Sequence, residues 1–169
     1  DRVGCFILIN LIKQDLPFDM HFTFVTQEEI GVRGAKVAAF SVDPDIAIVV
    51  EATTAADVKG ASAEKQVCKI GHGAVIAFMD KSTIYDRELY ELALKLAKEN
   101  GIKIQIKSLV AGGNDSGAIH ATRGGVKTIA VSLPCRYLYT ACSMICADDI
   151  WETQKLVQKL AEKICEKEI

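Results

Sequence analysis

The stretch Ile46-Ala47-Ile48-Val49-Val50 is a continuous run of apolar, mostly β-branched side chains. It follows the turn sequence Asp43-Pro44-Asp45 and stops at Glu51. Apolar runs of this length, bounded by turn residues, are typical of central strands that are covered on both faces. The sequence therefore predicts a buried strand with Glu51 at its end.

Helical and strand patterns alternate on both sides of this run. Helices are predicted over residues 4–13, 33–40, 85–100 and 148–168, with a short one after the glycine-rich loop 112–117. Strands are predicted over residues 21–26, 74–79, 103–106 and 128–133, the last stopping at Pro134. This alternation predicts a three-layer α/β fold, and without an internal repeat or linker we expect one domain over residues 1–169.

Charge and hydropathy exclude two classes of partner. The 20 basic and 22 acidic residues give a formal net charge of −2 and are mixed along the chain. Nucleic-acid phosphates are bound by basic blocks, so no nucleic-acid partner is expected. No apolar run approaches the ~20 residues that span a bilayer, so membrane insertion is not expected either.

The cysteines and the first residues bear on location. No two cysteines show the paired spacing of a metal site, so we interpret them as reduced, buried small side chains. With no signal-peptide pattern, a cytoplasmic location is expected. The chain opens at Asp1 without an initiator methionine, as the middle of a longer protein does. The six cysteines are Cys5, Cys68, Cys135, Cys142, Cys146 and Cys165.

Acidic residues recur where predicted strands give way to loops. Glu28 and Glu29 follow one strand, Glu51 ends another, and Asp115 lies in the glycine-rich loop. Carboxylates that meet at one sheet edge repel one another unless a cation, a proton or an arginine compensates them. Two alternatives stay open: Glu28 and Glu29 could be a solvated pair capping the next helix, and Glu51 could turn to solvent.

Other common chemistries find no support in the motifs. The Gly112-Gly113 pair lacks both the dinucleotide fingerprint and the Walker lysine pattern. No serine lies in a nucleophile elbow, and no cysteine has a clear histidine partner. His21, His72 and His120 show no metal-site spacing and are interpreted as structural.

Five blocks of sequence stand out in order, at residues 1–5, 26–35, 47–55, 112–120 and 134–140. Together they resemble the dinuclear metallopeptidases of the tetrahedral aminopeptidase, glutamyl aminopeptidase and FrvX family, often labelled endoglucanase M. The resemblance covers nearly the whole chain and implies a three-layer α/β/α zinc-peptidase-like fold with a mixed, mostly parallel sheet. It identifies the chain as the C-terminal part of a catalytic domain, without its upstream strands and small β-rich domain.

The resemblance also assigns roles to the acids. It implies that Glu28 is the general base that activates a metal-bound water and that Glu29 is a metal ligand. Glu51 corresponds to the ligand of the other metal, usually Asp in the family, and two zinc or cobalt ions are implied per complete site. Asp1 resembles the second member of an Asp-Asp pair whose bridging member would precede this chain. Small peptides are the implied substrates, and family members commonly form homo-oligomeric dodecamers.

The sequence departs from the family at several positions. Tyr139 stands where the family has a ligand histidine, and tyrosine is a rare zinc ligand, so weaker binding of the metal shared with Glu29 is expected. Asn114 and Ser116 replace the usual Thr and Ala, and Ala74 replaces a usual Pro. Another ligand histidine is expected from the upstream part.

Three functional hypotheses follow from these residues. The first is a metal-dependent aminopeptidase of which this chain is one part. The second, motivated by Tyr139, is a non-catalytic relative that binds peptides or regulates a partner. The third is a glycoside hydrolase using Glu28 and Glu51, which the single tryptophan, Trp151, does not favour because sugar grooves are usually lined by aromatic rows.

Overall fold

The computed structural model describes residues 1–166 as a layered α/β fold. Its helices are α1 (Arg2–Ile12), α2 (Arg33–Val42), α3 (Arg87–Glu99), α4 (Ser116–Ile119) and α5 (Ala147–Glu166), with a 3-10 turn at Ala63–Lys65. Its strands are β1 (Ile46–Thr54), β2 (Ala74–Ile76), β3 (Ile104–Ile106) and β4 (Lys127–Cys135). The predicted end of the last helix at residue 168 lies outside the described residues.

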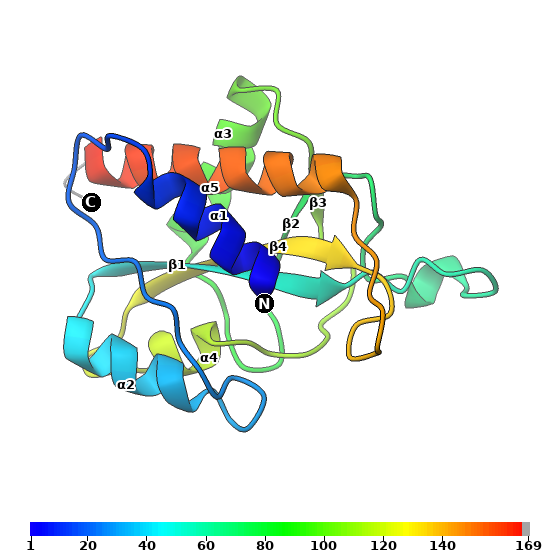
Figure 1. The fold of residues 1–169 in the computed structure, drawn as a ribbon, viewed down its shortest axis with the longest axis horizontal. Helices are drawn as coiled ribbons and strands as arrows, with labels where there is room; N and C mark the ends of the chain where they lie inside the picture. Colours follow the sequence, from blue (N-terminus) through cyan, green and yellow to red (C-terminus); the bar gives the residue numbers. More distant parts are fainter. Residues whose placement is uncertain (167–169) are drawn as a thin grey trace.

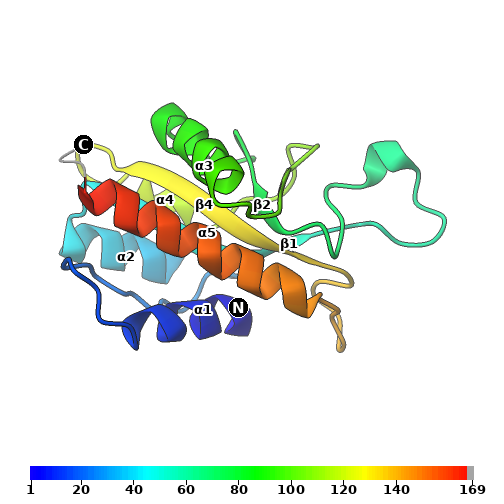
Figure 2. The ribbon, with the colours of Figure 1, turned by 90° about the horizontal axis from the view of Figure 1, so that it is seen from above.

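One mixed sheet forms the middle layer, with the strand order β1-β4-β2-β3. β1 runs parallel to β4 and β2 parallel to β3, whereas β2 and β4 are antiparallel. Helices α1, α3 and α5 cover one face, and α2 and α4 cover the other (Figures 1 and 2). The three-layer α/β/α fold with a mostly parallel sheet is therefore confirmed.

The main core lies between the sheet and the α1, α3, α5 layer. It joins buried side chains of all three helices to those of the strands, including Ile7, Leu89, Ile129, Leu156 and Leu160. Burial of such side chains is the main favourable term in folding. Within this layer Asp149, in the first turn of α5, accepts hydrogen bonds from Gly71 N and Gly73 N, both at 2.7 Å, and so fixes the chain entering β2.

The position of β1 shows that the expectation of a buried central strand with Glu51 at its end is wrong. Among the described residues β1 pairs only with β4, so it is an edge strand, and most of its side chains are half-buried. The strand enclosed on both sides is β4. β1 also continues three residues beyond Glu51, which therefore lies within the strand and not at its end.

The predicted strand over residues 21–26 is wrong. The segment has no ladder partner within residues 1–166, and it lines the same hollow as β1. The predicted stop at Pro134 is also wrong, since β4 runs on to Cys135. Cys135 O accepts from Ala55 N, so the nitrogen of Pro134 faces the β2 side, where pairing has already ended at Ser132.

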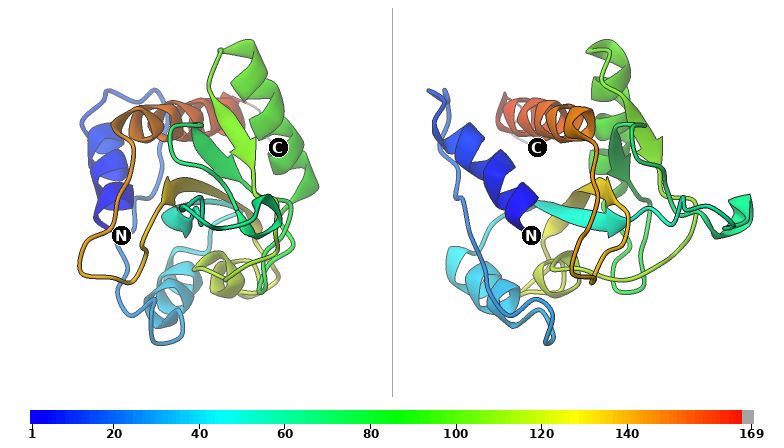
Figure 3. Two further views of the ribbon diagram at one scale, coloured as in Figure 1. Left: turned by 90° about the vertical axis from the view of Figure 1, so that its right-hand side faces the viewer. Right: turned by 45° about the vertical axis from the view of Figure 1, so that its right-hand side comes forward.

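Two further features complete the fold. The segment with the 3-10 turn Ala63–Lys65 projects beyond the end of β1, away from the layers (Figures 1 and 3). All six cysteines are free in the described chain, but only Cys68 and Cys135 are buried, so the expected burial is wrong for the others. None of the described helices combines the length and the apolar character that crossing a membrane requires.

Candidate metal and active site

A hollow of about 1010 Å³ lies beside β1 and collects the residues singled out from the sequence. Glu28 and Glu29 reach it from the loop before α2, and Glu51 from β1 itself. Tyr139 reaches it from the loop after β4. Asp115, from the glycine-rich loop, is a further acid on its wall. The four predicted positions are therefore brought together by separate segments.

A tight turn before α2 presents Glu28 and Glu29. Glu28 O accepts from both Gly31 N (3.1 Å) and Val32 N (2.9 Å), and Gly34 N bonds to Thr26 O (3.1 Å). A Cβ at Gly34 would lie 2.2 Å from Thr26 O, so this close approach requires glycine. The N-cap of α2 is Val32 and its first turn holds no acid, so the alternative that the pair caps this helix is wrong.

Glu51 is held inside the site and is not turned to solvent. Its Oε1 accepts from Asn114 Nδ2 at 2.9 Å and from the hydroxyl of Ser132, its neighbour on β4, at 3.4 Å. Part of the side chain is exposed, yet its carboxyl group is deeply enclosed. Desolvation raises the pKa of Glu51 to about 8, against the opposing charge of Lys107.

Two other acids of the hollow, Glu28 and Asp115, also have raised pKa values. Burial raises the pKa of Glu28, and the negative charges of Glu29 and Asp115 add to the effect. Burial likewise raises the pKa of Asp115. The pKa of the largely exposed Tyr139 is raised by desolvation and then by the charges of Glu29 and Glu28. Desolvation is thus the main cause of these shifts, and repulsion from neighbouring acids adds to it at Glu28 and Tyr139.

The acidic side chains of the hollow have the negative charge that a divalent cation requires, but within residues 1–166 they do not form a complete metal site by themselves. Asp115 Oδ1 is buried without a hydrogen-bond partner in the described chain, and it lies in the same acidic hollow. Cations relieve such repulsion between carboxylates. No group of three His, Cys, Asp or Glu side chains within residues 1–166 has the geometry of a complete metal site. Further ligands would have to come from elsewhere.

Asp1 takes a structural role within this chain. Its Oδ1 accepts from Gly4 N at 2.9 Å and so caps α1, whose first residues lie against β1 at the hollow. An acid at this position also suits the helix dipole.

Three residues of this region went unnoticed in the sequence. The positive charge of Lys107 lowers the pKa of Glu51 and so opposes the effect of burial. Its Nζ donates to Ala111 O at 2.7 Å. Asp80 and Tyr85 are buried next to Asn114. Only Asp80 carried a sequence signal, because Asp followed two residues later by Ser is typical of a side-chain-capped turn.

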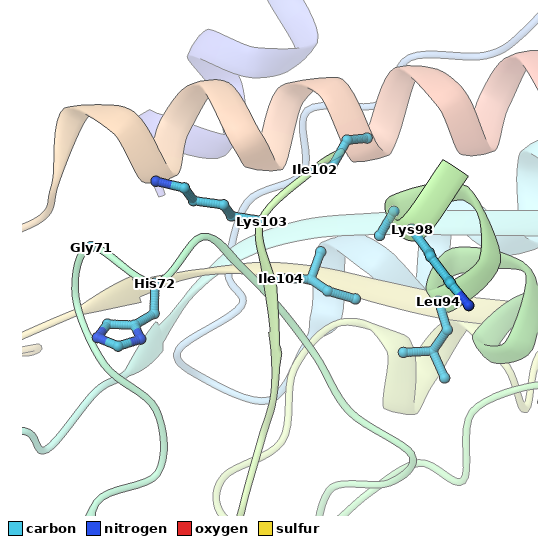
Figure 4. A pocket seen from close by; sticks show the side chains of 8 residues that line it. Gly71, His72, Leu94, Lys98, Ile102, Lys103 and Ile104 are labelled. Atoms are coloured by element: carbon cyan, nitrogen blue, oxygen red, sulfur yellow. The ribbon is translucent and has the colours of Figure 1, made fainter. Parts of the chain in front are cut away.

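Of the three histidines, His21 lines the acidic hollow, whereas His72 and His120 do not. His21 and His72 are exposed, and Nδ1 of His120 lies 2.9 Å from Ser116 O. His72 borders a second hollow of about 570 Å³, shown in Figure 4 with Lys98, Lys103 and apolar side chains of α3 and the chain leading to β3. No carboxylate lines it, so it offers none of the chemistry of the first hollow.

Comparisons with known proteins agree with the fold. A family described as M42 glutamyl aminopeptidase matches residues 1–156. A putative aminopeptidase of Acetivibrio thermocellus is 40% identical over 167 residues, which are 98% of this chain and 49% of that protein. The chain thus spans about half the length of the curated relatives it matches.

Solved structures show the same relationship. The TET aminopeptidase of the marine sediment archaeon Thaumarchaeota archaeon SCGC AB-539-E09 is 31% identical, with a TM-score of 0.89 over 97% of this chain and 47% of that one. The TET1 peptidase of Pyrococcus horikoshii, which assembles into a tetrahedron or an octahedral shell, is 32% identical. Its TM-score is 0.81, over 97% of this chain and 48% of that one.

Proposed function

The chain belongs to the M42 glutamyl aminopeptidase family, and on that premise we propose that the whole protein is a metal-dependent aminopeptidase acting on small peptides. The observation that carries the proposal is the convergence of Glu28, Glu29 and Glu51 on one hollow from separate segments. The relatives reported above are named aminopeptidases or peptidases. They favour neither the non-catalytic nor the glycosidase alternative.

In this proposal Glu29 and Glu51 each hold one of two divalent ions, zinc or cobalt. When bound, such an ion lowers the pKa of its water towards ~7 and polarises a carbonyl oxygen. Glu28 accepts the proton of the attacking water, and its raised pKa brings it closer to neutral pH, where a general base works best. Glu28 then delivers this proton to the leaving amine.

The proposed metal site differs from the usual site of the family at Tyr139, which stands in place of a ligand histidine. A phenol is a weaker zinc donor than an imidazole at neutral pH. The ion held by Glu29 should therefore exchange more readily than the ion held by Glu51. Because the related TET peptidase of Pyrococcus horikoshii forms closed shells, we also propose that the whole protein assembles with copies of itself.

The test uses the full-length protein and the variant Glu28→Gln, which keeps the size of the side chain but cannot take a proton. With zinc or cobalt added, turnover of aminoacyl-nitroanilides should fall about 10²–10⁴-fold, the usual worth of a general base. Elemental analysis after dialysis should show unchanged metal content in Glu28→Gln and a reduced content in the matched variant Glu29→Gln. A metal-loaded wild type without turnover would show that the fold serves another purpose.

A further inference from the structure

A buried polar cluster lies directly behind Glu51. It consists of Asp80, Tyr85 and Asn114, which are 3%, 3% and 6% exposed. These residues come from the hairpin-like turn before α3 and from the glycine-rich loop before α4. Buried polar side chains are costly unless each is hydrogen-bonded, so such a cluster is retained only where its geometry is well satisfied.

The hydrogen bonds fix the orientation of the Asn114 amide. Its Nδ2 lies 2.9 Å from Glu51 Oε1, 2.9 Å from Tyr85 Oη and 3.2 Å from Asp80 Oδ2, so its two hydrogens are shared among three acceptors. Tyr85 Oη itself donates to Asp80 Oδ2 at 2.6 Å, so it must accept from Asn114. A flipped amide would place oxygen against the carboxylate of Glu51 and lose the bond from Ser116 N to Asn114 Oδ1 at 2.8 Å.

The cluster is also anchored from behind. Asp80 Oδ1 accepts from Ser82 N at 2.7 Å and from Thr83 N at 2.8 Å. The glycine-rich loop packs closely on the same turn, because a Cβ at Gly113 or Gly117 would lie 2.7 or 2.6 Å from Ser82 Oγ. Asn114 is therefore held at both its backbone and its side chain.

Glu51 is bound on one side only. Among the described residues, the hydrogen bonds to its carboxylate all end on Oε1, while the residue itself lines the hollow. A carboxylate fixed through one oxygen presents the other in a defined direction. Partners of this kind orient metal ligands, and their loss commonly costs about 10–100-fold in metal affinity.

We propose that Asn114 is a positioning residue that locks the carboxylate of Glu51 with one oxygen facing the hollow, ready for a divalent cation. Asn114 is itself held by Ser116 N and by Asp80 Oδ2, contacts that do not depend on the hydroxyl of Tyr85. The proposal rests on the proposed function in treating Glu51 as a metal ligand. It assigns to Asn114 no contact with substrate or metal.

The test compares three variants of the full-length protein. Asn114→Thr can still accept from Ser116 N but is one bond too short to reach Glu51, and Asn114→Leu loses both contacts. Tyr85→Phe damages the same cluster but leaves the bond between Asn114 and Glu51. The probe is Co²⁺ alone, titrated into metal-free protein and followed by its visible absorption bands, which report ligand geometry.

Both Asn114 variants should bind Co²⁺ about tenfold or more weakly, with altered bands. Tyr85→Phe should melt at a lower temperature yet bind Co²⁺ within about threefold of wild type, because the positioning contact remains. Wild-type affinity and bands in Asn114→Thr would overturn the proposal, since the role of Asn114 would then be to anchor the loop. A loss in Tyr85→Phe as large as in Asn114→Thr would also overturn it, because general damage to the cluster would explain both.

Crystal structures of the metal-free wild type and Asn114→Thr separate this proposal from the proposed function. A wild type that binds no Co²⁺ and has no turnover contradicts the proposed function. Even then, a single orientation of Glu51 in the wild type that is lost in Asn114→Thr supports the positioning role. An unchanged orientation in the variant overturns it.

Discussion

Strands β1 and β4 have equal length and pair residue for residue, yet their surroundings differ. β4 is buried at every position but the first, because β1 and β2 flank it. β1 is half-buried at most positions and borders the hollow. Both strands are rich in apolar residues. The comparison teaches that the fully enclosed strand and the strand carrying the proposed metal ligand Glu51 are direct neighbours with different surroundings.

The largest test of this comparison replaces Ile129 of β4 and its register partner Ile48 of β1. Ile129 is fully buried, so Ile129→Ala should lower the free energy of unfolding by about 3–4 kcal/mol through lost transfer energy and a cavity. Ile48→Ala, at a half-buried position, should cost about 1–2 kcal/mol. Urea unfolding of the full-length variants measures both. Equal losses would mean that β1 is as enclosed as β4.

A smaller loss of stability is expected from breaking the ion pair between Arg136 and Asp57, beyond the ends of the two strands. Arg136, just after β4, donates to both oxygens of Asp57 at 2.7 Å, and this holds the pKa of Asp57 below its usual value. The pair therefore stabilises the fold above the unfolded-state pKa of about 4 and loses its effect as the pH falls through the lower folded-state pKa. Asp57→Asn should cost about 1–2 kcal/mol at neutral pH and progressively less in acid.

Thermal melts across this pH range measure that effect. Glu91→Gln is the matched control, because it removes a fully exposed ion pair with Arg87 and should leave the melting temperature nearly unchanged at every pH. A deficit in Asp57→Asn that persists undiminished below the folded-state pKa would contradict the assignment of the ion pair.

The smallest effect on stability is expected from the aromatic contact between helices α1 and α5. Phe6 of α1 and Trp151 of α5 form an edge-to-face pair, with ring centroids 5.9 Å apart and an interplanar angle of 67°. Both rings are about half exposed, so a double-mutant cycle with Phe6→Leu and Trp151→Leu should give a coupling of about 0.5–1 kcal/mol. A coupling near zero would show that α1 is held to α5 by its buried residues alone.

Most helices and strands were predicted correctly because short sequence signals, such as helix caps, determine where they begin and end. α3 begins after Asp86, whose side chain accepts from Leu89 N, and such caps are visible in a sequence. The acids Glu28, Glu29 and Glu51 were predicted as one group, and they do meet at one hollow. The strand positions behind that prediction were wrong, since residues 21–26 form no strand and Glu51 lies within β1. The edge position of β1 could not be predicted, since apolar content does not reveal how many neighbours a strand has.

The cluster around Asn114 escaped prediction for a related reason. Asn114 lies 34 residues after Asp80 and 29 after Tyr85, and the packing of the glycine-rich loop on the turn around Ser82 brings them together. The roles of Glu28, Glu29, Glu51 and Tyr139 in metal binding and catalysis stay predictions. They depend on ligands and chemistry outside these described residues.

The free edge of β1 has a practical consequence for handling the polypeptide. Backbone groups along an unpaired strand form hydrogen bonds with any extended chain that reaches them, and apolar edges are common starting points of aggregation. No lysine or arginine lies within Ile46–Thr54, and Glu51 is its single charge, so little repulsion protects this edge. Copies of these 169 residues produced by themselves should therefore tend to join edge to edge and lose solubility.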